Sequence, residues 1–106
     1  MRMDYRPVIA DLSNAIRQEP ACAFFYYNRG CIYSRIKAED EARRDYDKAI
    51  QLNPSLAEAY YNRGLLLVGQ QNYQDGFADL SKAGELGIYS AYSLIKHFRR
   101  VQQGKK

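Results

Sequence analysis

Few side chains of this chain could do chemistry, and their spacing argues against an active site. The one histidine, His97, stands beside Lys96 and Arg99 in a segment predicted to be an exposed helix. A general base needs a substrate pocket and an orienting partner within hydrogen-bond reach. The sequence also has no nucleophile elbow and no glycine-rich phosphate loop. We predict that the chain is not an enzyme and uses no cofactor.

The two cysteines, Cys22 and Cys31, are nine residues apart. A zinc site needs a second cysteine pair or nearby histidines, which the sequence lacks. Both cysteines fall in one predicted helix, where nine residues span about 13 Å of axis, beyond disulfide reach. The acidic run at residues 39–41 begins a helix, where the dipole favours negative charge. We predict reduced packing cysteines and no metal site.

Positive charge is concentrated at the C-terminus. The 106 residues include 16 basic and 12 acidic side chains, but residues 1–90 hold 11 of the basic ones and all 12 acidic ones. A nucleic-acid-binding domain carries a basic stripe across a folded face instead. We therefore predict no specific nucleic-acid partner. Nonspecific contact of the basic tail with RNA, DNA or anionic lipid stays open as an alternative.

Apolar residues are too scattered for a membrane protein. No run approaches the roughly 20 apolar residues of a spanning helix, and residues 1–7 lack the apolar core of a signal peptide. Together with cysteines read as reduced, these features favour a cytoplasmic location.

The side chains above are positioned by a unit that repeats every 34 residues. The segment Ala23–Gly30 returns as Ala57–Gly64, and Pro20 is followed by Pro54 at the same distance. The second half of the unit keeps this register, with aspartates at Asp11, Asp45 and Asp79. Such a period is typical of a solenoid, in which each unit buries its apolar face against its neighbours.

These repeated residues resemble the tetratricopeptide repeat (TPR) family, whose unit is a 34-residue helix–turn–helix. The family pattern is matched at Tyr26, Gly30, Tyr33, Ala42, Tyr46 and Pro54, and again at Tyr60, Gly64, Leu80 and Ala83. The second unit departs from the pattern at Gly76 and Ile88. The resemblance implies an all-α fold, a right-handed superhelical TPR-type solenoid of stacked antiparallel helix pairs with five to six helices.

We expect helices over about 5–18, 22–36, 39–52, 56–69, 73–85 and 88–101, forming one domain of residues 1–106. Within it, the register gives these parts: 5–20, a half unit with the second helix only; 22–54 and 56–87, two full units; 88–101, a capping helix; and 102–106, a basic tail. The missing partner of the first helix indicates a C-terminal fragment of a longer repeat protein. A chain that begins with half a unit is the alternative. For residues 88–101, an amphipathic helix lying on a membrane is the alternative to a cap.

The resemblance further implies a concave groove, lined by the first helix of each unit, in which partners bind as peptides or helices. Carried over by register, the groove residues are Phe24, Tyr27, Asn28, Cys31, Arg35, Glu58, Tyr61, Asn62, Leu65, Tyr92 and Lys96, with Ile95 and Arg99 beside them. Asparagine amides can bond a peptide backbone, and tyrosines offer rigid contact area. We predict a non-catalytic protein–protein interaction scaffold. The alternative for the repeated Tyr-Asn pairs is a role common to every repeat.

Other repeated residues are predicted to hold the scaffold together. Tyr26, Tyr33, Tyr46 and Tyr60 are expected in the core, and Arg29 and Arg63 are expected to pair with acidic side chains. The family's carboxylate clamp for acidic chaperone tails is not predicted. Tyr27 and Cys31 occupy positions where that clamp needs lysine and asparagine.

Self-assembly is the second hypothesis for function. If the first helix lacks its partner, an apolar strip is left exposed, formed by Val8, Ile9, Leu12 and Ile16. Exposed apolar patches mark interfaces, so the strip predicts a homodimer of the isolated chain. In a longer parent protein, docking of the preceding helix on the strip is the alternative.

Overall fold

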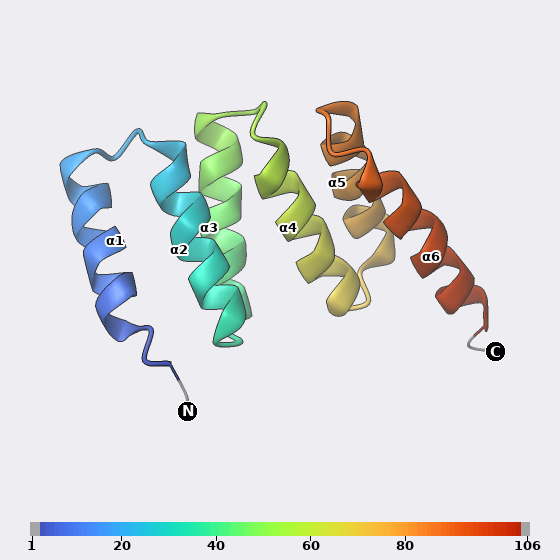
Figure 1. The fold of residues 1–106 in the computed structure, drawn as a ribbon, viewed down its shortest axis with the longest axis horizontal. Coiled ribbons are helices and arrows are strands. Elements are labelled where there is room, and N and C mark those ends of the chain that lie inside the picture. Colours follow the sequence, from blue (N-terminus) through green and yellow to red (C-terminus); the bar gives the residue numbers. More distant parts are fainter. Residues whose placement is uncertain (1–2, 105–106) are drawn as a thin grey trace. The chain divides into compact units, whose positions relative to one another are not determined.

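The computed structural model describes residues 3–104, which form six α-helices and no strand (Figure 1). The helices are α1 (Arg6–Gln18), α2 (Ala23–Arg35), α3 (Glu39–Leu52), α4 (Ala57–Gly69), α5 (Tyr73–Glu85) and α6 (Ser90–Gly104). The predicted all-α fold is confirmed.

The predicted helix bounds agree with the structure to within one residue, except in the last helix. α6 begins at Ser90 instead of residue 88, because Ile88 belongs to the preceding turn and donates its N–H to the Ala83 carbonyl at 2.9 Å. α6 also runs past residue 101 to Gly104, through two glutamines that favour helix. Residues 105–106 of the predicted tail lie outside the described residues.

Two of the turns that join the helices use a left-handed residue that is not glycine. Lys37 has φ 66° after α2, and Gln71 has φ 63° after α4. The next residue in each turn donates its N–H back to the helix, from Ala38 to the Tyr33 carbonyl and from Asn72 to the Leu67 carbonyl, both at 2.9 Å. These bonds satisfy carbonyls that the helix end leaves free, and they hold the tight turn without a glycine.

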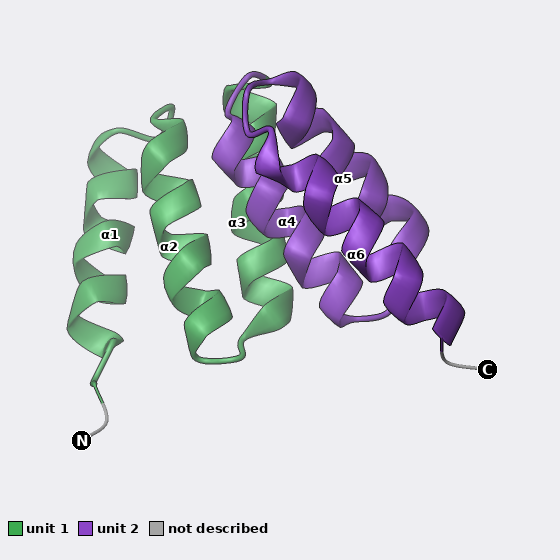
Figure 2. Ribbon diagram, turned by 45° about the vertical axis from the view of Figure 1, so that its right-hand side comes forward, with its two compact units in different colours: residues 1–54 green, residues 55–106 purple. Residues whose placement is uncertain are grey.

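The chain divides into two compact units, Met1–Pro54 and Ser55–Lys106 (Figure 2). In unit 1, α2 packs against α1 and α3, and in unit 2, α5 packs against α4 and α6. Helices that pack together within a unit run antiparallel (Figure 1). The border follows Pro54, the residue predicted to end the first full repeat. The prediction of one domain over 1–106 stays a prediction.

Each unit has its own buried centre. In unit 1, α3 contributes Ala42, Tyr46 and Ala49, of which the most accessible, Tyr46, is 2% exposed. The buried cluster of unit 2 comes from all three of its helices and consists of Val68, Leu80, Ala83, Ala91 and Ile95. The repeated alanines Ala49 and Ala83 are therefore core residues. So are Tyr46 and Leu80, which occupy the same position of the repeat, and the prediction for Tyr46 is confirmed. Tyr26, Tyr33 and Tyr60 are only partly buried.

Close helix approach explains the repeated glycines. A Cβ atom added at Gly30 would lie 2.9 Å from Cε1 of Tyr46. One added at Gly64 would lie 2.9 Å from Cγ of Leu80 and 3.0 Å from the carbonyl oxygen of Gly76. A side chain at either glycine would clash with the paired helix.

Candidate functional site

The two repeated arginines are fixed by buried aspartates. Arg29 Nε and Nη2 donate to the two carboxylate oxygens of Asp45, both at 2.8 Å. Arg63 makes the same bidentate pair with Asp79, at 2.7 and 2.8 Å. The hydrogen bond to Asp45 raises the pKa of the Arg29 guanidinium. Both arginines therefore join helices within a unit, as predicted.

Aromatic rings cover these guanidinium groups. The Cζ atom of Arg29 lies 6.0 Å from the Tyr26 ring centroid and 5.8 Å from that of Tyr33. In unit 2, Cζ of Arg63 lies 5.7 Å from the Tyr60 ring centroid. Cation–π attraction adds to the ion pair at such distances. These tyrosines help to hold the scaffold, although they are not fully buried.

Two predicted groove residues, Tyr27 and Cys31, lie next to the buried Tyr46 of unit 1. The Tyr27 ring centroid lies 6.2 Å from that of Tyr46. Burial raises the pKa of the Tyr46 hydroxyl above its ordinary value of 10.0, and the neighbouring Cys31 thiol adds to the rise. Cys22 and Cys31 are both free cysteines.

A cavity of about 560 Å³ opens between α1 and α2 in unit 1. Three predicted groove residues line it, namely Asn28, Cys31 and Arg35. Val8 and Leu12 line it too, although they were predicted for self-association. The other lining residues were not predicted to bind a partner, and they are Met3, Tyr5, Asp11 and Ile32.

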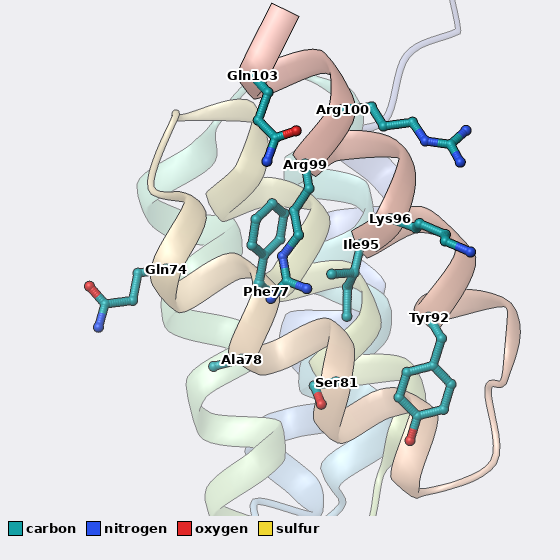
Figure 3. A pocket seen from close by; sticks show the side chains of 10 residues that line it. All are labelled: Gln74, Phe77, Ala78, Ser81, Tyr92, Ile95, Lys96, Arg99, Arg100 and Gln103. Carbon is teal, nitrogen blue, oxygen red and sulfur yellow. The ribbon is translucent and has the colours of Figure 1, made fainter.

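A larger cavity of about 840 Å³ opens between α5 and α6 in unit 2 (Figure 3). The predicted residues Tyr92 and Lys96 line it from α6. Ile95 and Arg99, placed beside the groove by register, line it as well. The remaining lining residues, Gln74, Phe77, Ala78, Ser81, Arg100 and Gln103, were not predicted to bind.

Exposure separates the predicted groove residues into two groups. Phe24, Asn28, Arg35, Glu58, Tyr92 and Lys96 are exposed, whereas Tyr27, Cys31, Tyr61, Asn62 and Leu65 are partly buried. Tyr61 and Leu65 pack against the buried cluster of unit 2. Register alone therefore does not separate side chains that make core contacts from accessible ones.

The predicted self-association strip is only partly accessible. Val8 is 40% exposed, and Ile9 and Leu12 are partly buried. Ile16 is buried, with only 9% of its surface exposed. Ile16 was expected to be exposed, and this was wrong. α1 packs against α2, so the helix is not wholly unpartnered.

Within residues 3–104, no group of three or more His, Cys, Asp or Glu side chains is arranged to hold a metal ion. None of the helices in that range is long and apolar enough to cross a membrane.

Comparison with known proteins identifies the fold. Residues 40–71 match a family model described as a TPR repeat, and these residues hold part of the 34-residue repeat. Residues 40–71 therefore form a tetratricopeptide repeat. The recognition made from the repeated residues is therefore confirmed.

Two solved structures share this TPR fold. The first TPR of Spaghetti (RPAP3), bound to the HSP90 peptide SRMEEVD, matches with a TM-score of 0.85 and 23% identity over 93% of this chain and 80% of that one. The first TPR domain of human RPAP3 matches with a TM-score of 0.86 and 23% identity, over 95% and 81%. No curated protein sequence matches the chain. At this level of identity, the structural likeness shows a shared fold.

Proposed function

We propose that this TPR chain is a non-catalytic protein-interaction module that binds a peptide segment of a partner protein. The observation that carries the proposal is the unit 1 cavity, where Asn28, Cys31 and Arg35 meet the apolar side chains of Val8 and Leu12. A cavity of about 560 Å³ falls in the range of ligand pockets, and it combines apolar contact area with a few polar groups.

Two further facts support a peptide as the ligand. Asn28 and Arg35 are exposed and line the same cavity, where an amide can bond the backbone of a peptide and a guanidinium can bond its carboxylate. The first TPR of Spaghetti (RPAP3), which has the same fold, is bound to an HSP90 peptide. The ion pairs of Arg29 and Arg63 give such a surface a stable scaffold.

Selection from a phage-displayed library of random short peptides tests this proposal. We expect immobilised protein to enrich a related set of peptides over bare support, and labelled copies to bind in fluorescence anisotropy. Failure to enrich any peptide would contradict a peptide-binding module.

Two variants then test where the peptides bind. Asn28→Arg changes the cavity mouth, and Asn14→Arg makes the same change on the exposed surface of α1, outside the cavity lining. Peptides of the unit 1 cavity lose affinity in the first variant and keep it in the second. Equal affinity in both variants would remove the unit 1 cavity as the site.

A further inference from the structure

The α5/α6 cavity of unit 2 has a charge pattern that its counterpart in unit 1 lacks. Three of its ten lining residues are cations, Lys96, Arg99 and Arg100, and none is acidic. In unit 1, Arg35 shares the cavity with Asp11. A ligand of the α5/α6 cavity therefore meets positive charge that no lining carboxylate offsets.

These cations are available to a ligand. All three are exposed, and within residues 3–104 none of them forms an ion pair with a carboxylate. The Phe77 ring orients the Arg99 side chain, whose Cζ atom lies 5.3 Å from the ring centroid. Lys96 and Arg100 are one helical turn apart, about 6 Å along the axis. In Figure 3 both extend from α6 on the side away from Gln74.

The floor of the same cavity is apolar. Ile95 is 8% exposed and belongs to the buried cluster, and Phe77 packs against that cluster. Ala78 is exposed beside Phe77 on α5 and leaves room above the floor. Tyr92, 45% exposed, closes one end. A large apolar side chain of a ligand can therefore contact this floor, while the three cations line the same cavity.

We propose that the α5/α6 cavity binds an acidic peptide segment that places one large apolar side chain on Phe77 and Ile95, with flanking carboxylates on Lys96, Arg99 and Arg100. This inference rests on the proposed function and names the ligand class of one surface. The cations are spaced along a helix, so side-chain carboxylates of an internal segment match them. A free C-terminal carboxylate is not required.

Charge elsewhere in the chain favours a peptide over a polyanion. Residues 1–90 carry 11 basic and 12 acidic side chains, so an extended nucleic acid would find no continuous basic surface. The apolar floor also has no role in binding a phosphate backbone.

The test uses fluorescence anisotropy with labelled peptides capped at both ends. The acidic apolar probe is EDEFLDEE, and its controls are EDESSDEE, which lacks the apolar residues, and the basic KRKFLKRK. We expect only EDEFLDEE to bind strongly, and we expect its affinity to fall as salt screens the exposed charges. An uncapped copy is expected to bind equally well.

Two pairs of variants locate the probe. Lys96→Glu/Arg100→Glu should weaken binding by about tenfold, while Arg17→Glu/Arg43→Glu makes the same change of charge on exposed helix surface of unit 1 and should not. Ala78→Glu brings a negative charge onto the floor. Ala10→Glu, the exposed alanine at the same register position of α1, is its control. Circular dichroism shows that each variant is folded.

The outcomes separate this inference from the proposed function. Loss of binding in Lys96→Glu/Arg100→Glu and Ala78→Glu, but not in their controls, supports the site. Library peptides that bind while EDEFLDEE does not would overturn the acidic ligand and leave the peptide-binding module standing. Equal loss in the control variants, binding only by uncapped peptide, or binding only of polyuridine RNA or anionic phosphatidylserine vesicles would also overturn it.

Discussion

The helix pairs α2–α3 and α4–α5 are joined by the same kind of ion pair but differ in the residues that pack between the two helices. Each pair is joined by an arginine of the first helix and an aspartate of the second, 16 residues later. Each also brings a glycine of the first helix close to the second helix. The shared parts are those that set the spacing and orientation of two helices, which a repeat needs in every copy.

The pairs differ in what the glycine meets. Gly30 faces the ring of Tyr46, whereas Gly64 faces Leu80 and the backbone of Gly76. Gly76 stands where unit 1 has Ala42, and a Cβ added there would lie 2.7 Å from Cγ2 of Val68. α4 and α5 thus approach through two glycines, and α2 and α3 through one glycine and an aromatic ring. Backbone cannot move aside as a side chain can, so α4–α5 tolerates less change.

The largest effect is expected at this contact. Gly64→Leu should lower the free energy of unfolding by about 3 kcal/mol or more, because overpacking at a backbone contact has no easy relief. Urea denaturation measures the loss, with Gly69→Leu as the control, since a Cβ at Gly69 meets nothing within 4 Å. A Gly64→Leu midpoint equal to wild type would refute both the contact and the repeat register.

The ion pairs come next. Arg29→Met and Arg63→Met should each cost about 2 to 3 kcal/mol, since each leaves a buried aspartate without its charged partner. Arg29→Met/Asp45→Leu should recover part of the loss, because replacing both partners leaves no unpaired charge. Denaturation of the four proteins checks both statements. A loss below about 0.5 kcal/mol would place these pairs among ordinary surface ion pairs.

The smallest effect is a pH dependence that comes from Tyr46 in unit 1. Burial raises the pKa of Tyr46 above 10.0 in the folded chain, while the unfolded residue ionises near its ordinary value. The free energy of unfolding is therefore unaffected by this group below about pH 10. It falls above that pH, by about 1 kcal/mol at pH 11. Tyr46→Phe should remove this part of the alkaline destabilisation. Leu80, which occupies the same position of the repeat in unit 2, has no such group.

If wild type and Tyr46→Phe lost the same stability between neutral pH and pH 11, the hydroxyl of Tyr46 would not be protected. The other nine tyrosines are common to both proteins, so their ionisation cancels in the comparison.

The sequence predicted the helices well because their signals are local and repeated. The register of Gly30 and Gly64 and the positions of Ala49 and Ala83 allow little freedom in placing each helix. The predicted start of α6 was wrong because Ile88 closes the end of α5, which is a contact across a turn.

The candidate site was harder to predict. Phe77 and Ala78 lie on the second helix of a 34-residue repeat, and the family resemblance implies a groove only along the first helices. Their role depends on α6 packing beside α5, which no spacing within α5 reveals. Ile16, in turn, was expected to be exposed because the first helix was predicted to lack a partner, whereas α1 packs against α2.

The short span of the ion pairs has a consequence for protein synthesis. Asp45 follows Arg29 by 16 residues, and Asp79 follows Arg63 by the same interval. Closing so short a loop costs little entropy. Each helix pair can therefore form soon after its second helix leaves the ribosome. Unit 1, which ends at Pro54, contains every residue of its own ion pair and buried centre. The ion pair of Arg29 and Asp45 can therefore form while unit 2 is still being translated.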